Sequence, residues 1–124
     1  MDLKKKDHIF GLSMGEWIAR IPNDLDNDGV GLWEIIRDGR ESFSLEGDDL
    51  KEFVFLAIVS IMKEGGVPAI PSLSNKNIWG AARGYQGGES TVARKVIDQW
   101  TESGVDPDTE GIWFARIDEA DSSG

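Results

Sequence analysis

Three aspartates alternate with other residues in the segment Asp24-Leu25-Asp26-Asn27-Asp28-Gly29. Calcium takes about 6–8 oxygen ligands at about 2.3–2.6 Å, and carboxylates at every second position of a tight turn converge on one point. Gly29 permits a sharp turn directly after the third aspartate. The pattern therefore indicates a hard-cation site built from Asp24, Asp26 and Asp28, with Glu34 as the next carboxylate along the chain.

The same six residues resemble the first half of an EF-hand-type calcium loop, in which oxygen ligands occupy positions 1, 3 and 5 and glycine occupies position 6. The chain departs from that pattern at position 12, where a bidentate glutamate belongs: Ile35 stands there, and Glu34 comes one place early. Position 8, which is normally apolar, is Gly31, and Pro22 lies where a preceding helix would end. The alternative, which we favour, is an acidic turn that caps a helix starting near Val30.

A second candidate site lies in a polar, glycine-rich stretch of the chain. Its members are Ile78, Trp79, Arg83 and Tyr85, a combination of side chains typical of interface anchors. An exposed Trp79 predicts contact with a partner protein, whereas a Trp79 that folds back over the core is the alternative. Residues 80–91 also precede an expected helix, whose free backbone N–H groups bind anions. No register fits the phosphate-loop pattern, however, so we expect a surface loop there.

No set of side chains in the sequence combines a nucleophile, a base and a group that orients the base. The chain has no cysteine, and its one histidine is His8. The serines lack the glycine pattern of a nucleophile elbow. Paired acids such as Asp48-Asp49 are more typical of helix starts than of acid–base catalysis. We expect a non-enzymatic protein, with an enzyme based on paired carboxylates as the residual alternative.

The charge of the chain favours one class of partner. The 23 acidic and 13 basic side chains give a formal net charge of -10. This charge repels phosphate backbones and anionic lipid surfaces, which disfavours nucleic acids and membranes as partners. A basic protein surface is favoured, since electrostatic complementarity speeds encounter. The sequence predicts an acidic protein-binding module, either an inhibitor or immunity protein or an adaptor, with no cofactor unless the aspartate loop binds calcium.

A long helix is the surest element that would position these groups. It is expected to run from Asp48 or Asp49 to Glu64, with Asp49 and Glu52 spaced as a capping pair. Residues 53–59 are apolar on every face of a helix, which indicates a central element buried on several sides. The pair Gly65-Gly66 supplies the stop.

Shorter segments complete the predicted fold. We expect helices from Ser90 or Thr91 to Ser103, from Met14 to Ile21 and from Val30 to about Asp38, and strands at Ile112–Ile117 and Val67–Ile70. Gly104 ends the first of these helices, and Ser13 caps the second. Pro68 lacks an N–H group, which predicts an edge position for its strand. The result is a mainly helical α+β domain with a small two-stranded β element.

The length of the chain predicts a single domain over residues 1–124, with flexible ends at 1–8 and 119–124. The basic residues Lys4–Lys6 are not followed by the apolar run of a secretory signal. The longest apolar run, Phe53–Ile61, is too short to span a membrane. We therefore expect a cytoplasmic protein.

Overall fold

Four α-helices and one antiparallel sheet make up the described part of this computed structural model, residues 13–26, 29–71, 79–82, 84–107 and 111–116. For residues 24–26, 71 and 79–81 only the backbone is described. The helices are α1 (Met14–Arg20), the 3-10 helix η1 (Ile21–Asp26), α2 (Leu32–Phe43), α3 (Gly47–Lys63) and α4 (Glu89–Ser103), and the strands are β1 (Val30–Gly31), β2 (Val67–Pro71), β3 (Trp79–Ala81) and β4 (Trp113–Ala115). The predicted mainly helical α+β class is confirmed.

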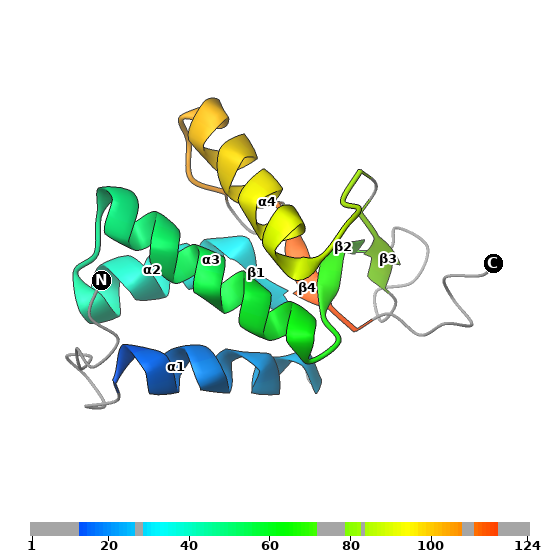
Figure 1. Ribbon diagram of the computed structural model, residues 1–124, viewed down its shortest axis with the longest axis horizontal. Coiled ribbons are helices and arrows are strands. Elements are labelled where there is room, and N and C mark those ends of the chain that lie inside the picture. Colours follow the sequence, from blue (N-terminus) through cyan, green and yellow to red (C-terminus); the bar gives the residue numbers. More distant parts are fainter. Residues whose placement is uncertain (1–12, 27–28, 72–78, 83, 108–110, 117–124) are drawn as a thin grey trace.

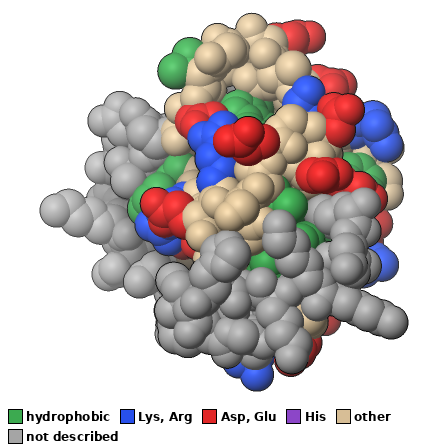
Figure 2. Space-filling model, turned by 90° about the vertical axis from the view of Figure 1, so that its left-hand side faces the viewer, with side chains coloured by type: hydrophobic (Ala, Val, Ile, Leu, Met, Phe, Trp, Pro, Cys, Tyr) green, Lys and Arg blue, Asp and Glu red, His purple; other side chains and the backbone are tan. Residues whose placement is uncertain are grey.

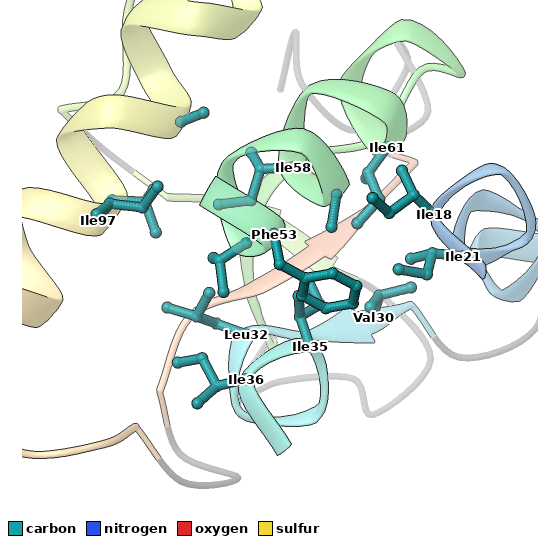
Figure 3. Close-up of a cluster of buried hydrophobic side chains, with 14 of the residues drawn as sticks. Ile18, Ile21, Val30, Leu32, Ile35, Ile36, Phe53, Ile58, Ile61 and Ile97 are labelled. Carbon is teal, nitrogen blue, oxygen red and sulfur yellow. The ribbon is translucent and has the colours of Figure 1, made fainter. Parts of the chain in front are cut away.

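Helix α3 is the centre of the fold, as its apolar sequence predicts. It contacts α1, α2, α4 and η1, and it crosses the middle of the molecule with α1 on one side and α4 on the other (Figure 1). Phe53 and Ile58 of α3 are fully buried, and Ile97 of α4 approaches them from one side (Figure 3). Ile18 of α1 and Ile35 of α2 close the core from the other directions (Figure 3). Burial of such side chains contributes about 1.5–3 kcal/mol each.

The two ends of α3 differ in how well the sequence predicts them. Its N-cap is Glu46, whose side chain makes no capping hydrogen bond, so the expected capping pair of Asp49 and Glu52 is wrong. Asp48 and Asp49 lie instead in the first turn, where their charges favour the positive end of the helix dipole. At the other end, Gly65 adopts a φ of +96° and ends the helix as predicted.

The shorter helices follow their local signals with one exception. Ser13 and Glu16 form a reciprocal capping box at the start of α1, and Gly104 ends α4 with a φ of +71°. Helix α2 begins at Leu32 instead of Val30 and runs beyond Asp38 to Phe43. It starts later because Val30 and Gly31 pair with β4. The N-cap of α2 is therefore Gly31, which has no side chain, so the expected acidic cap at Val30 is wrong.

The sheet is larger than predicted. Its strand order is β1-β4-β2-β3, and every neighbouring pair is antiparallel. The expected pairing of the two predicted strands is present, with Val67 opposite Ala115, but β1 and β3 extend the ribbon on either side. Phe114 of β4 is fully buried and joins the core. The sheet is thereby covered by the helices that a small ribbon needs for stability.

Pro68 lies in a central strand, which corrects the expected edge position. Its carbonyl oxygen accepts a hydrogen bond from the N–H group of Ala82 at 3.0 Å, on the β3 side. The missing N–H of Pro68 would point to the same side. Ala82 follows the last residue of β3, so the proline removes a bond only where that ladder ends.

Two further expectations concern the ends of the chain and membranes. Residues 1–8 and 119–124, which we expect to be flexible, lie outside the described residues. Within the described ranges, no helix combines the length and the apolar character needed to cross a bilayer.

Candidate functional site

Exposed carboxylates gather where α2 turns into α3. We call the five residues of this group the acidic corner: Glu41, Glu46, Asp48, Asp49 and Glu52, all of them exposed. Figure 2 looks onto the end of the molecule that contains this turn, and Asp and Glu side chains are scattered over its described surface among a few Lys and Arg side chains. From residue 41 to residue 52 the only base is Lys51.

Buried apolar side chains fix the turn that presents the acidic corner. Phe43 is fully buried, and its ring centroid lies 5.8 Å from those of both Trp17 and Phe53. Leu45 is 5% exposed, and its N–H donates to the carbonyl of Gly39 at 3.0 Å. The buried side chains of Phe43 and Leu45 therefore hold the neighbouring carboxylates at a packed, hydrogen-bonded turn between two helices rather than on a free loop.

The arginines of α2 next to the corner have acidic partners. Arg37 lies 3.5 Å from Asp38. Arg40 pairs with Asp106, its Nη2 donating to Oδ1 at 3.2 Å and its Nη1 to Oδ2. This pairing lowers the pKa of the Asp106 carboxyl and raises the pKa of Arg40. Arg40 also interacts with the charge of Glu46, so it offsets part of the charge of the acidic corner, while its hydrogen bonds go to Asp106.

Asp38, which lies in α2 one turn before Glu41, is the second carboxyl with a perturbed pKa. Burial raises its pKa, while the charge of Arg37 and hydrogen bonds from Trp17 and Arg37 act in the opposite direction. A raised pKa in a carboxyl marks candidate acid–base groups only where a second reacting group faces it. The described neighbours of Asp38 supply an arginine, an indole and the charge of Glu41, which form an electrostatic arrangement and no acid–base pair.

Of the four predicted partner-binding residues, only Tyr85 has a described side chain. Ile78 and Arg83 lie outside the described residues, and the backbone of Trp79 lies in β3, opposite Pro71, rather than in a loop. Tyr85 is half-buried, its hydroxyl donates to the side chain of Gln99, and burial raises its pKa.

A neighbouring lysine of α4 strengthens this attachment. Lys95 Nζ lies 5.4 Å from the centroid of the Tyr85 ring and donates to the carbonyl of Gly84. Tyr85 therefore helps to fasten the segment before α4 onto that helix. The anchor role of the four residues together stays a prediction.

The predicted calcium ligands are also only partly described. The backbone of Asp24 and Asp26 forms the end of η1, and Asp28 lies outside the described residues. Glu34 lies in the first turn of α2, and Ile35, at the position of the missing twelfth ligand, is 1% exposed in the core. The described side chains contain no group of three that would hold a metal ion. Calcium binding by the aspartate loop, the less favoured of the two interpretations of its sequence, stays an untested alternative.

One feature beside the corner had no signal in the sequence. The indole N–H of Trp100 donates to Asp106 Oδ1 at 3.0 Å, the oxygen that Arg40 also binds, so helix α2 and the segment after α4 meet at one carboxylate.

Comparison with protein-family models, with curated proteins and with solved structures finds no match for this chain.

Proposed function

We propose that the protein is a non-enzymatic, acidic protein-binding module that docks a basic surface of a partner protein at its acidic corner. The observation that carries the proposal is the exposure of all five carboxylates of the corner, at the end of α2, at the start of α3 and on the packed turn between them. The proposed role is that of an inhibitor or immunity protein, or of an adaptor. The proposed location is the cytoplasm.

Electrostatics gives the corner its proposed role. With a net charge of -10, the whole chain attracts a basic partner over a Debye length of about 10 Å at 0.1 M salt. The corner adds local complementarity, because its carboxylates need no ordering of the backbone before they meet lysine or arginine side chains. Binding through the corner should therefore weaken as the salt concentration rises.

The test is capture of a basic protein from a nuclease-treated lysate of the source cells by the immobilised protein at low salt. The paired substitution Asp48→Asn/Asp49→Asn removes two charges from the corner, and we expect it to reduce the captured amount severalfold. Its matched control, Glu64→Gln/Glu89→Gln, removes two charges at the end of α3 and the start of α4. Asp48 and Glu64 lie about 24 Å apart along the helix axis.

Each half of the proposal has its own contrary result. Equal loss of capture in the two paired variants would contradict the assignment to the corner, because net charge alone would then govern binding. Capture of no basic protein at low salt would contradict the protein-binding module itself.

A further inference from the structure

Helices α3 and α4 enclose a groove of about 440 Å³. Its lining residues are Lys51, Glu52, Phe55, Arg94, Ile97, Asp98 and Thr101, and we call it the α3–α4 groove. Phe55 and Ile97 form its apolar floor. The guanidinium carbon of Arg94 lies 5.3 Å from the centroid of the Phe55 ring, so this arginine is engaged with the floor.

The floor continues along α3 as an apolar stripe. Phe55, Leu56, Val59 and Met62, the outer stripe, are each only partly buried. Phe55, Val59 and Met62 recur at spacings of four and three residues, which places them on one face of the helix, opposite the buried Ala57 and Ile61. From Phe55 to Met62 the stripe extends for about 10 Å, or two helical turns.

The charges that line the groove balance, but acids are in excess at one end of it. Glu52 and Asp98 line it together with Lys51 and Arg94. One helical turn beyond the lining, Asp48 and Asp49 extend the acidic side on α3, and Glu102 extends it on α4; all three are exposed. Acids therefore outnumber bases where the start of α3 faces the end of α4, next to the acidic corner.

We propose that the α3–α4 groove and the outer stripe bind an amphipathic helix of a partner protein, with apolar side chains at i, i+3 or i+4 and i+7 and lysine or arginine beside them. Both walls are helices with internally satisfied backbones, so they offer no edge to an extended peptide. A helix with a two-turn apolar face matches the length of the stripe. This inference rests on the proposed function, because it assigns a structural element to the basic partner.

A second copy of the chain is the competing occupant. The two bases and two acids that line the groove would allow pairing across a two-fold axis. Each copy, however, carries a net charge of -10, and mutual repulsion opposes such a dimer. The same negative charge attracts a helix rich in lysine.

The probe is a fluorescently labelled two-heptad peptide with leucine at positions a, d and e and lysine elsewhere, and the control peptide has the same composition without a helical stripe. Fluorescence anisotropy at physiological salt measures its affinity for the full chain. We expect Phe55→Ala and Asp98→Lys each to weaken binding about tenfold or more. Glu64→Lys, which makes the same charge change outside the groove, should leave the affinity within about twofold.

The two groove variants answer different questions. Phe55→Ala changes no charge, so equal affinity of this variant and the wild type would overturn the groove, even with partner capture at the acidic corner intact. Asp98 is exposed, and its variant carries the test if Phe55→Ala fails to fold. Peptide binding that depends on both residues, without capture of any basic protein, would support the groove and contradict the proposed function.

Two other results would overturn the assigned occupant. Equal binding of the control peptide would show that no helical stripe is recognised. A dimer of the wild-type chain at micromolar concentration that Asp98→Lys dissociates would make a second copy the occupant.

Discussion

Arg40 of α2 and Asp106, which lies 66 residues further along the chain, form a bidentate ion pair. Trp100 of α4 donates its indole N–H to the same carboxylate. The three side chains tie α2, α4 and the segment after α4 together beside the acidic corner. The carboxylate of Asp106 is thus a small structural hub, and its protonation state should affect stability.

We predict that Asp106→Asn lowers the free energy of unfolding by about 0.2–1 kcal/mol at neutral pH, a modest loss because both side chains of the pair are 44% exposed. The pKa of Asp106 is lower in the folded state, so the contribution is present above the ordinary value of 3.8 and is lost as the pH falls through the folded pKa. Urea unfolding at neutral and acidic pH measures the difference. A loss that persists at pH values below both pKa values would contradict the ion-pair origin.

Asp38 should respond to pH in the opposite direction. Its pKa is raised in the folded state by burial, so the folded chain binds the proton more tightly than the unfolded chain. Stability contributed by this group is therefore lost as the pH rises from 3.8 through the folded pKa. We predict that Asp38→Asn, which keeps an acceptor for Trp17, gains stability relative to the wild type over that rise. A stability difference that does not change with pH would contradict this account.

Gly39 should not tolerate a side chain, although it lies in the middle of α2. A Cβ atom there would come within 2.6 Å of Leu50 Cδ1 and 3.0 Å of Phe53 Cδ1. Within a helix, alanine is more favourable than glycine by about 0.5–1 kcal/mol, but overpacking a core costs about 1–3 kcal/mol. We predict that Gly39→Ala lowers the thermal midpoint, measured by circular dichroism.

Gly88→Ala is the matched control for this prediction. A Cβ atom at Gly88 meets no heavy atom within 4 Å, and its φ of -72° suits alanine. Because Gly88 is the N-cap of α4, where glycine is preferred to alanine, the free energy of unfolding should fall by no more than about 1 kcal/mol. A Gly39→Ala protein as stable as the Gly88→Ala protein would contradict the close packing of α2 on α3.

Millimolar calcium should leave the thermal midpoint unchanged, as followed by tryptophan fluorescence against a chelator. The reason is that Ile35 occupies the place of the bidentate ligand and is buried in the core. Calcium at a hundredfold excess over its dissociation constant would add about 2.7 kcal/mol and raise the midpoint by several degrees.

A rise of that size would contradict the expectation if magnesium did not reproduce it. The control is Asp24→Asn/Asp26→Asn/Asp28→Asn, which should abolish such a rise. The aspartate loop would then be a calcium site in spite of its incomplete motif.

Elements whose signals act within one or two helical turns could be predicted from the sequence. Ser13 and Glu16, three positions apart, form the hydrogen bonds of a capping box, and Gly65 and Gly104 end helices through their own backbone conformations. The apolar run in α3 likewise predicts a central helix, since every face of it must be covered. The acids of residues 41–52 were readable in the same way, as an excess of charge on a short segment.

Contacts between residues far apart in the sequence depend on how the helices and strands pack, and local signals do not predict them. Val30 lies in a strand instead of a helix because it pairs with Phe114. Arg40 contacts Asp106 because the packing of α4 brings the segment after that helix next to α2. The α3–α4 groove exists because Phe55 and Asp98 are brought to facing helices. Such pairings depend on closing long stretches of chain, which burial of the whole core makes favourable and which no local pattern encodes.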